Sequence, residues 1–485
     1  MRLRSGVAIA ALLAAALAAC ATTGGTTGQT PASSSAASPA PLLQGLDPAT
    51  TLDPFPSTYQ PLPRRDAAIV GATVFTGDGR RFDNGVVVMQ DGRITAVGGA
   101  DTPIPAGAQR IDGRGRFVTP GVIDAHSHLG VYPSPGIAAT SDGNEMTGPN
   151  QAGVWSEHAL WPQDPGFNRA REGGVTTLMI LPGSGNLFGG RSVTVRNVPS
   201  VSMQGMKFPG APYGLKMACG ENPPRTYGAR NQSPATGMGN VAGYRTGWIE
   251  AQNYRRRWDE YRQKVERGER ADPPTRDLRL ETLAGVLSGD ILVQNHCYRA
   301  DEMMLMLDVA REFGYRITTF HHASEAYKIA PVLARENICS AIWGSGWWGF
   351  KLESFDGIEE NAAILQQAGA CVVIHSDDAN LIQRLNQETA MAVSAARRAG
   401  IEVSDEQAIS WFTLNPARAL GIADQTGSLT PGKRADVVLW SAHPLSVYAR
   451  ADQVFIDGAV AFDRSDPRTR AASDYELGQP GREPR

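Results

Sequence analysis

Short β-like runs alternate with helical patterns through the middle of this 485-residue chain, and that alternation limits the fold more than any other feature. The β-like runs are rich in apolar and β-branched residues: VTPGVIDAH, GVTTLMILPG, YGLKMACGENP, ILVQNHCY, RITTFHHAS, ICSAIWGS and ACVVIHSDD. Segments between them, such as ADEMMLMLDVAREFG and LNQETAMAVSAARRAG, have the apolar spacing of helices. Repeated strand–helix units over this length predict an α/β protein in which residues 119–426 form a (β/α)8 barrel of the TIM type.

Both ends of the chain carry a different pattern. Residues 64–118 and 427–465 consist of short β-rich runs separated by glycine-containing turns, which is typical of antiparallel sheets. Because these two segments flank the α/β middle, they are expected to combine into one small composite β-sandwich domain. A polar tail follows at residues 466–485.

Residues 242–270 interrupt the alternation. Large apolar residues recur there at helical spacing among charges: Trp248, Tyr254, Trp258, Tyr261 and Val265. This pattern predicts an amphipathic helix inserted between barrel strands. The helix is either a surface helix packed by its aromatic stripe or a lid or dimer contact, and the sequence is compatible with a homo-oligomer.

The first residues predict export. Two arginines precede an apolar run too short to span a bilayer, as in a secretory signal peptide at residues 1–19. The segment Leu17–Cys20 resembles the lipobox of bacterial lipoproteins, which implies lipid attachment at Cys20; an ordinary signal peptide with a chance cysteine is the alternative. Ala21 favours the outer membrane, and residues 20–63, rich in Ser, Thr, Ala, Pro and Gly, are expected to form a flexible tether. The expected location is therefore the periplasm, with contact to the outer membrane through the lipid anchor only.

The remaining cysteines are expected to be free thiols. Cys219, Cys297, Cys339 and Cys371 each lie in or beside an apolar, strand-like run. A buried thiol is the more ordinary state there, so no disulfide framework is predicted, even for an exported protein.

The charge balance argues against nucleic acid as a partner. Lys+Arg number 46 and Asp+Glu 49, which gives a net charge of -3, and no basic patch is interleaved with aromatic residues. A small-molecule partner is expected instead.

Residues of the types that bind metals stand at the ends of successive predicted strands. His126 and His128 face the same side of an extended strand, because residues i and i+2 do so. Other strand ends carry Lys216, His296, His322 and Asp377. Since barrel active sites lie at the carboxyl ends of the strands, these six side chains are expected to converge at one mouth, and paired imidazoles there suit a metal ion.

As a set, these motifs resemble the amidohydrolase superfamily, in particular its imidazolonepropionase-like and related lipoprotein members. The resemblance covers nearly all of residues 66–463 and rests on TPGVIDAHSHLG, GLKMACGENPPRTYG, NHCYRADEM, FHHASEAYK, HSDDANL, TLNPARALGI and GSLTPGKRADVVLW. It implies a metal-dependent hydrolase with a composite β-sandwich beside the barrel.

The resemblance also implies the metal ligands. His126 and His128 would bind a first metal together with Asp377, and His296 would bind either that metal or a second one. One or two ions are implied, most readily zinc, although nitrogen and oxygen ligands of this kind also accept iron, manganese or cobalt.

The fourth and sixth strands leave alternatives open. Lys216 is either a carboxylated lysine that bridges two metals or an ion-paired or substrate-contacting amine. His322 is the sixth-strand histidine, a ligand when two metals bind and free to polarise the carbonyl oxygen of the substrate when one does. His321 is expected to pack or hydrogen-bond behind the site.

The implied reaction is hydrolysis of an amide or peptide-like C–N bond. A bound divalent cation lowers the pKa of its water from about 15.7 to about 7 and so supplies hydroxide. Asp377 would take the proton and pass it to the leaving nitrogen. Two alternatives stay open: an esterase, lactonase or phosphotriesterase that uses the same metal site, and a non-catalytic surface binding lipoprotein.

Three residues are candidates for binding the substrate. Tyr227 and Arg225 follow Lys216, where the tyrosine would donate to a developing oxyanion and the arginine would bind a carboxylate. Arg299, just after His296, is a second candidate for a carboxylate. The alternative for each is a role in fixing loop geometry.

Overall fold

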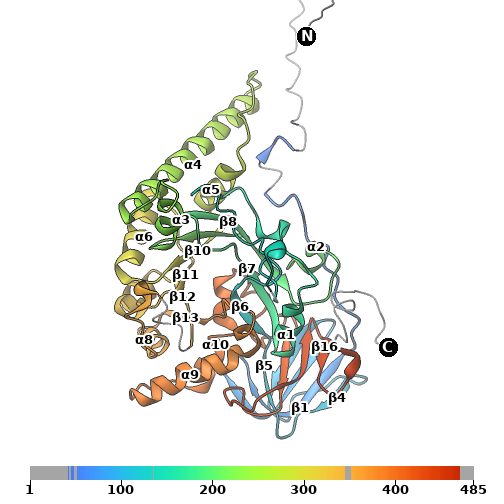
Figure 1. Ribbon diagram of the computed structural model, residues 1–485. Coiled ribbons are helices and arrows are strands. Elements are labelled where there is room, and N and C mark those ends of the chain that lie inside the picture. The colour runs from blue at the N-terminus through green and yellow to red at the C-terminus, as the bar shows by residue number, and fades with distance from the viewer. Residues whose placement is uncertain (1–41, 43–44, 49–51, 135, 345–350, 470–485) are drawn as a thin grey trace, which may run out of the picture.

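Two eight-stranded sheets form the body of the protein in this computed structural model, which describes residues 42, 45–48, 52–134, 136–344 and 351–469 (Figure 1). The predicted signal peptide, Cys20 and the chain after residue 469 lie outside the described residues. No helix within the described part combines the length and the apolar character needed to cross a bilayer.

The central sheet is a nearly closed barrel whose strands pair in chain order. Its strands are β6 (Val122–Ser127), β7 (Val175–Ile180), β8 (Phe188–Arg196), β9 (Gly214–Ala218), β10 (Leu292–Cys297), β11 (Thr319–His322), β12 (Cys339–Ile342) and β13 (Cys371–Ile374). Next to the last strand, the Asp377 amide donates to the carbonyl of His126, 3.0 Å away, so the two ends of the sheet meet. The predicted α/β barrel is therefore present.

Strand β8 departs from the all-parallel barrel expected for a (β/α)8 fold. It pairs antiparallel with both β7 and β9, whereas the other neighbouring strands of this sheet pair in parallel. The sequence pattern did not reveal β8, because its sequence FGGRSVTVR lacks a continuous apolar run. The remaining seven strands still run in one direction, so their carboxyl ends meet at one edge.

Helices surround the barrel on its outer side (Figure 1). The α-helices of the described residues are α1 (Pro165–Glu172), α2 (Met203–Met206), α3 (Asn222–Gly228), α4 (Gly237–Glu266), α5 (Leu278–Ser288), α6 (Ala300–Phe313), α7 (Ala330–Arg335), α8 (Asn361–Gln367), α9 (Leu385–Arg398), α10 (Asp405–Ser410) and α11 (Leu414–Ala419).

Helix α4 is the helix predicted for residues 242–270. Trp248, Tyr254 and Trp258 are buried, and the helix packs against α5 and α6. The Trp248 ring lies 4.3 Å from the ring of Tyr315, centroid to centroid. The aromatic stripe therefore holds α4 on the barrel. This agrees with the first alternative given for this helix, a surface helix packed by its aromatic stripe.

The second sheet combines strands from both ends of the chain. They are β1 (Ala67–Phe75), β2 (Arg81–Gln90), β3 (Arg93–Gly98), β4 (Gln109–Asp112), β5 (Phe117–Pro120), β14 (Val437–Trp440), β15 (Ala451–Ile456) and β16 (Ala459–Asp463). Antiparallel pairing of β5 with β14 joins the two sets, and residues of both sets share one apolar cluster. A buried ion pair then ties this sheet to the barrel: Arg196 on β8 contacts Asp436 just before β14, with an Nη1–Oδ2 distance of 2.7 Å.

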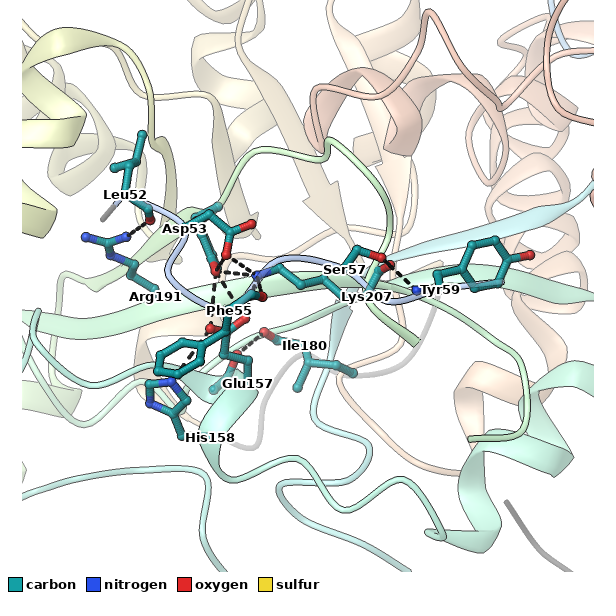
Figure 2. Close-up of polar contacts among 12 residues, drawn as sticks. Leu52, Asp53, Phe55, Ser57, Tyr59, Glu157, His158, Ile180, Arg191 and Lys207 are labelled. Carbon is teal, nitrogen blue, oxygen red and sulfur yellow. Dashed lines mark hydrogen bonds and ion pairs between the residues drawn. The ribbon is translucent and has the colours of Figure 1, made fainter. Parts of the chain in front are cut away.

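The described end of the segment predicted to be a flexible tether is docked on the barrel, so that prediction is wrong for residues 52–63 (Figure 2). We call these residues the strap. The Ser57 hydroxyl donates to the carbonyl of Lys207 at 2.6 Å, and the carbonyl of Leu52 accepts from Arg191 at 2.9 Å. The Tyr59 hydroxyl donates to Asp457 at 2.6 Å.

A buried lysine anchors the strap. Lys207 Nζ lies 2.7 Å from Asp53 of the strap and 2.9 Å from Glu157, whose carboxylate is fully buried. The hydroxyl of Tyr213, just before β9, completes the cluster. Composition could not reveal this contact, because the partners of Asp53 lie more than a hundred residues away in the sequence.

The prediction that the four cysteines are free thiols is wrong. Cys219 is bonded to Cys297, and Cys339 to Cys371. Cys339 and Cys371 stand directly opposite each other on the adjacent strands β12 and β13, with a Cα–Cα distance of 4.4 Å. Each cysteine does lie in or beside a strand, and Cys219, Cys297 and Cys339 are buried, but strand register decides which thiols meet.

Candidate metal centre

The six residues predicted from the strand ends do lie together at the carboxyl end of the barrel. The rings of His126 and His128 are 5.1 Å apart, and Lys216 Nζ lies 3.3 Å from His126 Nε2. The rings of His296 and His322 are 4.5 Å apart, and the His322 ring lies 4.9 Å from that of His126. His128 follows directly after β6, and the other residues come from β6, β9, β10 and β11, so the barrel gathers side chains that are far apart in the sequence.

Asp377 closes the cluster from the loop after β13. Its Oδ1 lies 3.1 Å from His128 Nε2 and 3.4 Å from His126 Nε2. Burial opposes ionisation, but the neighbouring His128 holds the pKa of Asp377 below its usual value. The side chain is therefore a carboxylate at neutral pH, the form that binds metals.

The ring orientation of His128 is fixed by the backbone. Its Nδ1 lies 2.8 Å from the carbonyl of Leu181, which only accepts hydrogen bonds, so Nδ1 carries the proton. Nε2 is then the ring nitrogen left to face Asp377, and it would be the atom that binds a metal.

A buried chain of hydrogen bonds also places the proton of His126 on Nδ1. Gln294 donates through Nε2 to the carbonyl of Ala419 at 3.0 Å, so its Oε1 faces His321 Nε2, 2.7 Å away, and accepts from it. Burial lowers the pKa of His321 well below its usual value, so the ring is neutral and its Nδ1 is an acceptor. His126 must then donate through Nδ1 across 2.9 Å, which leaves a lone pair on Nε2. His321 thus lies behind the site, as expected.

The donor set fits a divalent cation. Nε2 of His126, Nε2 of His128 and Oδ1 of Asp377 are all atoms that bind metals, and both nitrogens lie within 3.4 Å of the carboxylate oxygen. Acceptors this close repel one another unless a cation lies among them. Their ligand atoms, each within 4.8 Å of the others, form what we call the Asp377 set.

A second group of three imidazoles shares His126. His322 and His375 complete it, again with ligand atoms within 4.8 Å of one another, and we call it the His375 set. Burial lowers the pKa of His126 and His322 well below the usual value and that of His375 to about 3, so all three rings are neutral. The sequence-based reasoning missed His375, although it stands two residues before Asp377 in the same i, i+2 relation as His126 and His128.

Lys216 has the properties that carboxylation requires. Its side chain is fully buried, and burial lowers its pKa to about 7. About half of the amine is therefore neutral at pH 7, and only a neutral amine reacts with carbon dioxide.

A cavity of about 290 Å3 opens over the cluster. His296, His322 and Asp377 line it together with Arg225 and other residues of the surrounding loops: Asn144, Met146, Ser184, Gly185, Asn222, Thr226, Tyr298 and Lys351. Lys351 Nζ donates to Asn222 at 2.9 Å, and Arg225 ion-pairs with Glu221 at 3.5 Å. Two cationic side chains therefore stand at the cavity, of which the sequence analysis named only Arg225.

The other two substrate candidates do not line this cavity. The hydroxyl of Tyr227 is buried, donates to the carbonyl of Gly148 at 2.6 Å and accepts from Asn186 at 2.8 Å. Arg299 forms a two-pronged ion pair with Asp301, at 2.9 and 3.0 Å. Both side chains fix loop geometry, the alternative stated for them above.

An α/β barrel with a histidine–aspartate cluster at its carboxyl end is typical of hydrolytic barrel enzymes. The sequence model described as Amidohydrolase family matches residues 296–462. An amidohydrolase from Thermotoga maritima MSB8 of known structure is 34% identical, with a TM-score of 0.74, over 82% of this chain and 100% of that one.

Two curated relatives agree with this family. Amidohydrolase tasK of Hapsidospora irregularis is 32% identical over 412 residues, which is 80% of this chain and 41% of that protein. An imidazolonepropionase of Sphingopyxis alaskensis is 48% identical over 59 residues, or 12% of this chain and 14% of that protein. The matched part of this chain thus spans less than half the length of either relative.

The chain belongs to the amidohydrolase family. The resemblance seen in the motifs is confirmed at the level of the family.

Proposed function

We propose that this protein is a metal-dependent hydrolase that cleaves an amide or peptide-like C–N bond of a small molecule. The observation that carries the proposal is the convergence of His126 Nε2, His128 Nε2 and the Asp377 carboxylate, three atoms of the kinds that bind divalent metals. Lys216, His296 and His322 stand beside them as further ligands for one or two ions, with zinc as the favoured metal.

The residues around the centre would have different roles in the reaction. A bound divalent cation would supply Lewis acidity and lower the pKa of water. Asp377 borders the cavity and would take the proton of the attacking water on its carboxylate, then pass it to the leaving nitrogen. His322 faces the same cavity and would bind the metal or polarise the carbonyl oxygen of the substrate.

Asp377→Asn tests this assignment. The amide cannot accept the proton, so kcat is expected to fall by about 10²- to 10⁴-fold, the usual contribution of a general base. Asp378→Asn is the matched control, because Asp378 uses its Oδ1 only to accept from the amides of Asn380 and Leu381, which an asparagine can also do. Unchanged hydrolysis by Asp377→Asn with the metal retained would remove Asp377 from the mechanism.

The cations at the cavity bear on the class of substrate. Arg225 and Lys351 favour a substrate with an anionic group near the scissile bond. A panel of N-acyl amino acids, dipeptides, cyclic amides, esters and lactones, ranked by kcat/KM, distinguishes the C–N hydrolase from the ester and lactone alternatives. A preference for esters would overturn the proposed bond class.

We also propose that the protein is exported and lipid-anchored at Cys20, which the leader and lipobox support. Labelling with a radioactive fatty acid, in the chain and in Cys20→Ser, tests the anchor. The shared apolar cluster of the terminal strands further supports a two-layer β-sandwich for the second sheet.

A further inference from the structure

His375 is a buried imidazole that makes no hydrogen bond with any described residue. Its side chain is fully inaccessible to solvent, and neither Nδ1 nor Nε2 has a partner within the described residues. A buried polar group without a partner is costly, and native structures normally supply a ligand, an ion or an ordered water for it. The ring nitrogens of His375 are therefore available to a ligand.

The neighbours of His375 indicate what kind of ligand this ring would bind. Its ring lies 5.0 Å from the ring of His126 and 5.1 Å from that of His322, and His322 Nδ1 is also buried without a hydrogen-bond partner in the described chain. Asp377 follows two residues later. Imidazole nitrogens that are buried and grouped in this way suit a transition metal rather than an organic ligand.

His126 cannot serve two ions at once. Its Nδ1 is committed to His321, so only Nε2 can bind a metal, while both the Asp377 set and the His375 set include this ring. If His126 completes the Asp377 set, an ion on the other side of the centre must find its imidazoles elsewhere. His322 and His375 are the two that the His375 set offers.

We propose that His375 is a metal ligand, which binds an ion on the His322 side of the centre. The inference rests on the proposed metal-dependent function and adds a ligand that the strand-end motifs do not include. It makes the segment His375–Asp377 the counterpart of His126–His128, each contributing two donors that are two residues apart in the sequence.

Metal binding by the purified full-length protein tests the proposal. Zinc stoichiometry is measured by elemental analysis after equilibrium dialysis, zinc affinity by competition with a chromophoric chelator, and the ligand field by visible spectroscopy of the cobalt(II) form. In His375→Ala and His375→Gln we expect either the loss of one zinc equivalent or an affinity loss of more than about 100-fold, beyond what an outer-shell partner contributes. The cobalt spectrum should change as well.

His443→Ala is the matched control, because it removes a histidine whose Nε2 pairs with Asp405 on the outside of the cavity. It should keep the stoichiometry, affinity and spectrum of the parent protein. Retention of all three by both His375 variants would overturn the proposal while leaving the metal-dependent function intact. A parent protein that binds no metal and hydrolyses nothing in the substrate panel would overturn the proposed function itself.

A crystal structure of the zinc-loaded parent protein needs no variant to fold. Anomalous scattering should place a zinc ion about 2.0–2.1 Å from a ring nitrogen of His375. Zinc peaks at the centre with none within bonding distance of that ring would refute the assignment directly.

Discussion

Gln294→Met should weaken zinc binding although Gln294 is not itself a candidate ligand. Its Oε1 accepts from His321 Nε2 at 2.7 Å, and that bond keeps the proton of His126 on Nδ1. Without the acceptor, His321 can carry its proton on Nδ1 instead. His126 would then hold its own proton on Nε2, the nitrogen that faces Lys216 and Asp377, and could not bind a metal.

The size of the effect follows from burial. Gln294, His321 and His126 are all fully buried. Loss of the hydrogen bond therefore leaves the buried N–H of His321 without an acceptor, at a cost of about 1–3 kcal/mol. This corresponds to a factor of about 5 to 150 in the equilibrium between the two tautomers. We therefore expect the Kd for zinc to rise by about 10- to 100-fold, the range typical for loss of an outer-shell partner.

The assay is a zinc competition titration with a chromophoric chelator, and urea unfolding of the same samples reports stability. Gln294→Glu is the matched control, because it keeps the acceptor for His321 and should bind zinc at least as tightly as the parent protein. Equal zinc affinity in Gln294→Met and the parent protein would show that the hydrogen-bond chain does not set the tautomer of His126.

Three further predictions concern stability. Lys207→Met leaves the buried carboxylate of Glu157 without its cation and should lower the free energy of unfolding in urea by about 3–5 kcal/mol; a loss below about 1 kcal/mol would contradict the anchoring of the strap. Burial and a neighbouring glutamate raise the pKa of Glu302 from 4.5 to about 7. The folded protein therefore binds this proton more tightly than the unfolded chain, and the stabilisation is complete at low pH and disappears as the pH rises to about 7. Glu302→Gln should be about 1–2 kcal/mol more stable than the parent protein at alkaline pH and no more stable under acid conditions, as thermal unfolding across pH would show; equal pH dependence in both proteins would argue against the raised pKa. Alkylation of the unreduced, denatured protein should leave Cys339 and Cys371 unmodified, and loss of their bond should lower stability by about 2–4 kcal/mol, whereas full alkylation by mass spectrometry would contradict the pairing.

The sequence predicted those parts of the fold whose signals are local. Barrel strands buried on both faces give continuous apolar runs, and the stripe of α4 repeats at helical spacing, so both could be recognised. Strand β8 and the strap could not, because their polar groups are balanced by distant partners: Arg196 pairs with Asp436, and Asp53 with Lys207. Hydrophobic patterning carries no information about such pairs.

In the candidate site, too, the sequence predicted what has a local signal and missed what depends on contacts between distant residues. The strand-end position singled out the six residues that the barrel brings together, because parallel strands place their carboxyl ends at one edge. His375 had a usable signal, its i, i+2 relation to Asp377, whereas Gln294 had none, since its role depends on the register of β10 and β11. Tyr227 and Arg299 lie close in sequence to the cluster, yet their side chains find partners away from the cavity. Sequence proximity does not determine side-chain direction in a loop.

The pairing of β5 with β14 has a consequence for how the molecule assembles. These strands lie more than three hundred residues apart, so the second sheet cannot be completed until nearly the whole chain has been synthesised. Contacts of such long sequence separation form late and slowly. Until then β5 presents an open hydrogen-bonding edge, and a nascent or truncated chain that ends before β14 would be prone to intermolecular strand pairing.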